Sequence, residues 1–166
     1  MDPRTSNLGF RSQPAGGNVQ APITGFQATG GAGQVSVAKL EELAVKVALL
    51  EAAISVPRPA GVGHNRGPEL EAERNDEQEI RDFIARLTDA PATSLSTAIV
   101  QELAEKEAKR ADEGIQRHTE FAKGVLRGAG FVAGKKIVEQ LTESAWWISV
   151  YNRLMDVAHT LRDLFL

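Results

Sequence analysis

Apolar residues recur at intervals of three and four along much of the chain, which is the period of an amphipathic helix. The clearest stripe lies in residues 36–55, where it fills the two core positions of about two heptads, as in a coiled coil. Ser36 is a suitable N-cap for this helix, and Pro57 and Pro59 stop it. The stripe consists of Leu40, Leu43, Val47, Leu50 and Ile54.

The stripe in residues 36–55 must be buried against something, because an isolated helix of this length is marginal in water. It is narrow enough to fit one partner helix, so we expect a homotypic coiled coil. The alternative is that the helix packs on its own domain.

A second stripe predicts a helix that begins at Thr142 or Ser144 and runs to the end of the chain. Its apolar positions are Trp147, Val150, Tyr151, Leu154, Ala158, Leu161 and Phe165. We expect Trp147, Tyr151, Leu154, Leu161 and Phe165 to join the first stripe in an interface with a partner chain.

Two further helices are predicted between these stripes. Residues 68–90 begin with acids, and their apolar side chains come late, at Ile80, Phe83, Ile84 and Leu87. Residues 95–127 have Ile99, Leu103, Ile115, Phe121 and Val125 as apolar contributors. The middle of this helix, residues 104–114, has almost no hydrophobic anchor, so we expect an exposed stalk there, loosened at Gly114.

These elements predict an all-α protein with extended helices, a short coiled-coil segment and a C-terminal helical hairpin. Residues 1–34 are rich in Gly, Gln and Pro and lack a helical period, which indicates a disordered tail. The remaining divisions are a coiled-coil-like helix over 35–56, a Gly/Pro linker over 57–68, an acidic amphipathic helix over 69–90 and a C-terminal helical module over 91–166.

Composition narrows the function. The net charge of −3 argues against nucleic-acid binding by the chain as a whole. Only 5% of residues are aromatic, and the hydrophobic share of 42% depends on Ala, so we expect the chain to complete its core with another copy or another protein. The absence of cysteine excludes disulfides, Cys-ligated zinc and thiol nucleophiles and fits a cytoplasmic protein. The sequence shows neither a secretory signal pattern nor a membrane-spanning apolar run.

The linker motif GVGHNRGP places His64, Asn65 and Arg66 among glycines. A general base needs an orienting group, and a metal needs several ligands, and neither lies nearby in the sequence. A phosphate cradle would need a preceding strand or a Walker lysine. We therefore interpret the motif as a turn or as a short peptide that a partner recognises, and we expect no catalytic residue, metal or cofactor.

Residues 62–70, which contain GHNRGP followed by acids, resemble the GHNxGP or GHNxPP signature of short proteins from alphaproteobacteria and their phages. This resemblance implies a small accessory protein of bacterial or mobile-element origin. It brings no activity with it.

The sequence therefore predicts a non-enzymatic, oligomeric interaction or structural protein. The alternative is a small membrane-active effector that uses the segment Gly124–Gly134 and the Trp-rich last helix on an anionic lipid surface. The basic residues of that region are Lys123, Arg127, Lys135 and Lys136.

Overall fold

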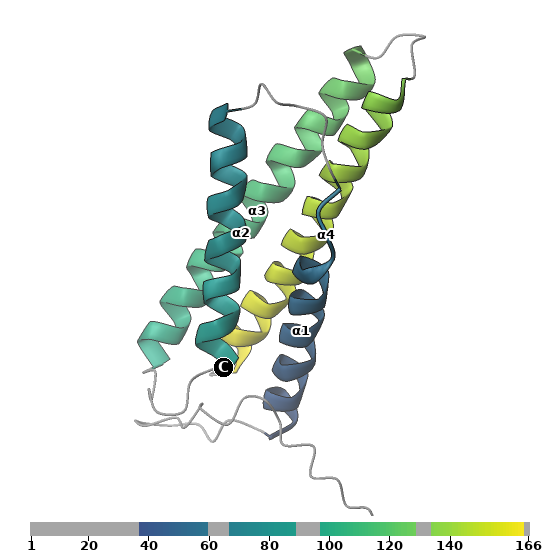
Figure 1. The fold of residues 1–166 in the computed structure, drawn as a ribbon. Helices are drawn as coiled ribbons and strands as arrows, with labels where there is room; N and C mark the ends of the chain where they lie inside the picture. The colour runs from purple at the N-terminus through teal and green to yellow at the C-terminus, as the bar shows by residue number, and fades with distance from the viewer. Residues whose placement is uncertain (1–36, 60–66, 89–96, 129–133, 165–166) are drawn as a thin grey trace, which may run out of the picture.

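The computed structural model describes residues 37–59, 67–88, 97–128 and 134–164, and the described residues are almost entirely helical (Figure 1). The helices are α1 (Val37–Ser55), α2 (Gly67–Thr88), α3 (Thr97–Gly128) and α4 (Lys135–Asp163). The prediction of an all-α fold is confirmed. The predicted disordered tail, residues 1–34, lies outside the described residues.

Helices α3 and α4 form a long antiparallel hairpin, whose closed end projects beyond the other two helices (Figure 1). Helix α4 begins at Lys135, earlier than the predicted start at Thr142 or Ser144. The reason is visible at Thr142, whose hydroxyl donates to the carbonyl of Val138 at 2.7 Å, one turn back in the same helix. Such a bond belongs to the interior of a helix and not to an N-cap.

The hairpin packs a face of small residues on α3 against large residues on α4. Val100, Ala104, Ala111 and Gly114 are buried on α3. Trp147, Val150, Tyr151 and Leu154 are fully buried on α4. The predicted exposed stalk over residues 104–114 is therefore wrong, because small side chains let α3 approach α4 closely. Ile99, which was expected to anchor α3, is about half exposed.

Helices α1 and α2 complete one hydrophobic core with the hairpin. Helix α1 lies along α4. The ammonium group of Lys46 on α1 donates a hydrogen bond to the Thr160 hydroxyl of α4 at 2.7 Å. Helix α2 enters the core through its second half, as its late apolar cluster predicted. The buried members of that cluster are Ile80, Phe83, Ile84 and Leu87.

Candidate functional site

The predicted partner interface is buried inside this single chain. Leu43, Val47, Leu50 and Ile54 of α1 and Trp147, Tyr151, Leu154 and Leu161 of α4 are all at most 2% exposed. Leu40 is partly buried against the same core, and Phe165 lies outside the described residues. The expectation that these stripes face a partner chain is thereby corrected, since α1 packs its stripe on α4, and α4 packs its stripe on both α1 and α3.

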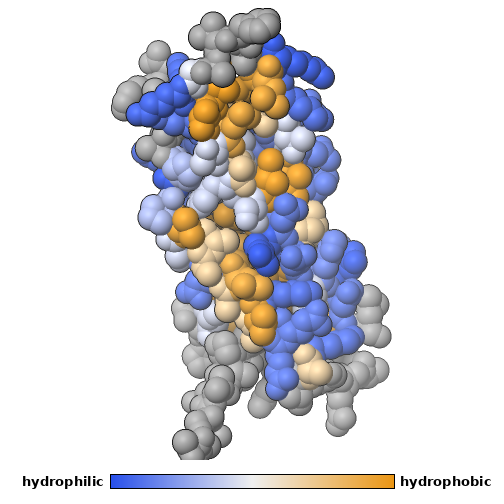
Figure 2. Space-filling view, turned by 90° about the vertical axis from the view of Figure 1, so that its right-hand side faces the viewer, coloured by the Kyte–Doolittle hydropathy of each residue, from blue (hydrophilic) through white to orange (hydrophobic). Residues whose placement is uncertain are grey.

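Helix α1 has a second apolar face, which the sequence analysis did not single out. Val45 and Leu49 are 60% and 43% exposed, the neighbouring Ala48 and Ala52 are exposed, and Val56, directly after the helix, is 54% exposed. Figure 2 views the molecule from the side that α1 forms in Figure 1 and shows apolar side chains over the lower half of this face. The signal in the sequence was that α1 is the most hydrophobic of the four helices and has few polar positions.

A second exposed apolar patch lies at the closed end of the hairpin. Leu126 at the end of α3 and Val138 near the start of α4 are each 61% exposed. Basic side chains surround them, and all four are exposed: Lys123, Arg127, Lys135 and Lys136. Glu120 pairs with Lys123 at 2.7 Å, and Glu139 lies 3.7 Å from Lys135, so this end remains basic.

The linker motif residues His64, Asn65 and Arg66 lie outside the described residues. Arg58 lies in the described part of the linker, between Pro57 and Pro59, and contacts two other helices. One of its nitrogens, Nη2, lies 3.0 Å from a Glu73 oxygen and 2.9 Å from a Glu143 oxygen, and both carboxylates are buried. Its guanidinium carbon is 5.9 Å from the centre of a Trp147 ring. Arg58 therefore joins the end of α1 to α2 and α4.

Buried aromatic rings form a stack at the centre of the molecule. The ring of Trp147 stacks on His118 at 5.6 Å and on Tyr151 at 5.4 Å between centroids. His118 of α3 is buried, and His159 of α4 is exposed. Within the described ranges, no group of His, Asp and Glu side chains could hold a metal ion. This holds also for Asp156, His159 and Asp163, which share one face of α4.

Tyr151 connects three helices through its hydroxyl. The hydroxyl donates to Asp76 of α2 at 2.7 Å and accepts from Arg117 of α3 at 2.9 Å, and Arg117 also pairs with Asp76 at 2.6 Å. Burial, together with donation to the Asp76 carboxylate, raises the pKa of Tyr151 well above its usual value, so it stays a neutral phenol. The ring passes α3 at Gly114, where a side chain would collide with it.

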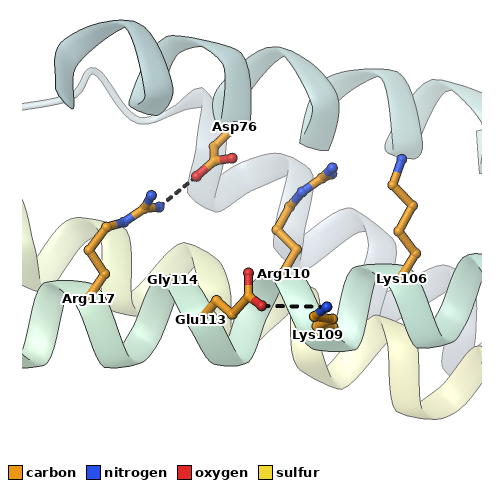
Figure 3. A pocket seen from close by; sticks show the side chains of 7 residues that line it. All are labelled: Asp76, Lys106, Lys109, Arg110, Glu113, Gly114 and Arg117. Atoms are coloured by element: carbon orange, nitrogen blue, oxygen red, sulfur yellow. Dashed lines mark hydrogen bonds and ion pairs between the residues drawn. The ribbon is translucent and has the colours of Figure 1, made fainter. Parts of the chain in front are cut away.

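A polar groove separates α2 from α3 above this tyrosine (Figure 3). Its volume is about 280 Å³, and its residues are Asp76, Lys106, Lys109, Arg110, Glu113, Gly114 and Arg117. Four cationic side chains thus meet two carboxylates. The spacing of Lys106, Arg110 and Arg117 by four and seven residues places them on one face of α3, which was the available signal in the sequence. Asp76 comes from another helix, which no local pattern indicates.

Glu107 lies behind the groove, on the buried face of α3. Its side chain is 2% exposed and accepts from Arg110 at 2.8 Å, while Arg110 also pairs with Glu79 of α2. Burial raises the pKa of Glu107 to about 7, against the opposing effect of the nearby Lys106 and Arg86, and Asp76 adds to the rise. Glu107 therefore changes charge near neutral pH.

Comparison with family models, with curated proteins and with solved structures finds no match to this chain. Over the described residues, no helix carries an apolar stretch long enough to cross a membrane.

Proposed function

We propose that this protein is a non-enzymatic interaction protein that self-associates through the outer face of α1. The observation that supports the proposal is the exposure of Val45 and Leu49 on a helix whose opposite face is already buried, together with the exposed Val56 directly after it. The exposed side of α1 also carries Glu41, Glu42 and Glu51, so the apolar face is a stripe between charged residues, which is the pattern of a helix face that packs on another element. A cytoplasmic location is part of the same proposal and fits the absence of cysteine.

A second copy of the chain is the partner that this face fits best. The face is one helix wide and combines the large Val45 and Leu49 with the small Ala48 and Ala52. In an antiparallel pair centred between Ala48 and Leu49, Val45 lies opposite Ala52 of the second copy, and Leu49 lies opposite its Ala48. Large side chains then meet small ones on both sides of a two-fold axis, as an isologous interface requires.

Light scattering after size exclusion tests this proposal. We expect the full chain to be a dimer that dissociates on dilution, and we expect Val45→Glu with Leu49→Glu to be monomeric, since each charge would be desolvated in the pair. Leu126→Glu is the matched control, because it places the same charge on an equally exposed apolar residue outside α1. Both variants should retain the helical circular dichroism of the wild type. A wild-type monomer at all concentrations, or a dimer that survives both α1 substitutions, would refute the proposal.

The second candidate function is attachment to an anionic membrane surface through the closed end of the hairpin. The exposed Leu126 and Val138 beside Lys123, Arg127, Lys135 and Lys136 favour it. Trp147 is fully buried and does not face a membrane, so this candidate function depends on the hairpin end alone.

Vesicle flotation separates the two candidates. If the hairpin end binds lipid, the full chain floats with vesicles that contain phosphatidylserine and not with purely phosphatidylcholine vesicles. Leu126→Glu should then abolish flotation, and the double α1 variant should preserve it. Equal recovery with both kinds of vesicle, or none with either, would argue against this candidate.

A further inference from the structure

The groove between α2 and α3 has the features of a built binding site. Arg110 and Lys106 extend from α3 toward α2, and Arg117 stands at the other end (Figure 3). Gly114 lies between them in the lining and adds no side chain to the groove. Arg110 and Arg117 are seven residues apart, which is about 10.5 Å along the helix axis.

Both arginines are held in place by carboxylates. Asp76 and the Tyr151 hydroxyl hold Arg117, and Glu107 and Glu79 hold Arg110. Arg117 makes these bonds through Nη2 alone, so its Nε and Nη1 donors make no hydrogen bond within the described part of the chain. A guanidinium that is already oriented loses little freedom when it binds an oxyanion.

The charge of the lining favours an anion. Lys106, Lys109, Arg110 and Arg117 face Asp76 and Glu113, which leaves an excess of two positive charges in the lining. Glu79, which pairs with both Lys106 and Arg110, offsets one of these two charges. Glu107 offsets the second only when it is ionised, and burial raises its pKa to about 7. Lys109 lies 3.8 Å from Glu113 and is largely exposed, so it can turn toward a ligand.

We infer that this groove binds a phosphorylated small molecule, with Arg110 and Arg117 as fixed guanidinium groups and Lys106 and Lys109 as mobile charges. Arginine matches phosphate geometry because its planar group donates two parallel hydrogen bonds to two oxygens. The volume of about 280 Å³ lies below that of pockets for drug-sized ligands, and it suits a ligand with one or two phosphoryl groups.

Isothermal titration of the full chain with inorganic diphosphate tests the inference, in buffer whose ionic strength is held constant with sodium chloride. We expect saturable binding in the micromolar to millimolar range. Arg117→Gln should weaken it about ten-fold or more, which is the usual effect of removing a charged hydrogen bond. Arg153→Gln removes an exposed arginine from the outer side of α4 and is the matched control.

Two further variants keep the test decisive if Arg117→Gln disturbs the fold. Lys106→Gln and Lys109→Gln change side chains that are 60% and 78% exposed, so the fold should tolerate both, and each should weaken binding several-fold. Absence of saturable binding to the wild type would overturn the inference. So would an equal loss of affinity in Arg153→Gln, because the attraction would then come from overall charge and not from the groove.

Discussion

Gly114 is the residue at which α2, α3 and α4 depend most closely on one another. A Cβ atom at this position would collide with the Tyr151 ring, far inside van der Waals contact. The ring is fully buried, and its hydroxyl is fixed by Asp76 and Arg117, so it has little room to move. Glycine is required here for space in a helix interior, although it costs about 1 kcal/mol of helix propensity.

Gly114→Ala should therefore lower the free energy of unfolding by about 1–3 kcal/mol, because the added methyl group overpacks the core. Gly124→Ala in the same helix is the matched control, since its Cβ would meet nothing within 4 Å. That variant should raise the free energy of unfolding by up to about 1 kcal/mol through helix propensity. Urea unfolding followed by circular dichroism measures both. Equal effects of the two substitutions would contradict the packing argument.

Glu107 predicts a specific pH dependence of stability. Its pKa rises from 4.5 to about 7 on folding, so the folded state binds the proton more tightly than the unfolded state. As far as Glu107 contributes, the free energy of unfolding is greatest below pH 4.5. It falls as the pH rises from there to about 7, by up to about 1.4 kcal/mol per pH unit.

Glu107→Gln removes this titration and keeps a polar partner for Arg110. We expect the variant to match the wild type near pH 4 and to be the more stable of the two above pH 7. Denaturant titrations at several pH values measure the difference, and Glu113→Gln, at an exposed carboxylate of the same helix, is the control. Parallel pH profiles for the wild type and Glu107→Gln would show that burial does not perturb this group.

At the scale of elements, α1 and α2 are attached to the hairpin in different ways. Helix α1 buries a full apolar stripe against α4, so its attachment is hydrophobic. Helix α2 buries its apolar cluster in its second half, and its acids Glu73, Asp76 and Glu79 pair with arginines of other segments. The attachment of α2 should consequently be the more sensitive of the two to salt.

Arg58 differs from the other polar connections because it contacts two buried carboxylates at once. Arg58→Ala should lower the free energy of unfolding by about 3–5 kcal/mol, since Glu73 and Glu143 would lose the cation that holds them both. Arg153→Ala, at an exposed position of α4, should change it by less than about 0.5 kcal/mol. Thermal and urea unfolding compare the two. A small effect of Arg58→Ala would contradict the role of Arg58 as the cation that holds both carboxylates.

At the scale of the whole molecule, the sequence predicted which segments are helical but not how they combine. The predicted helix over residues 36–55 agrees with α1 (Val37–Ser55), and the late apolar residues of α2 are buried as expected. The stripe from Leu40 to Ile54 did not reveal its partner, because heptad spacing is the same whether the facing helix belongs to the same chain or to another copy.

The polar sites were missed for a different physical reason. Glu107 and His118 lie on the buried face of α3, and a hydrophobic pattern excludes such residues from a core. Gly114 suggested a loosened helix because no local pattern shows why glycine is needed there. The Tyr151 ring, which occupies the space beside it, is 37 positions away in the chain. The groove combines a face of α3 with Asp76 of α2, and only the tertiary fold brings these together.

The path of Tyr151 past Gly114 also fixes the register of the hairpin. Were α3 to slide by one turn along α4, the ring would meet Arg110 or His118 in place of the glycine. The phenol would then lose its route to α2. The Tyr151 ring therefore acts as a steric lock against a one-turn slide of α3 along α4.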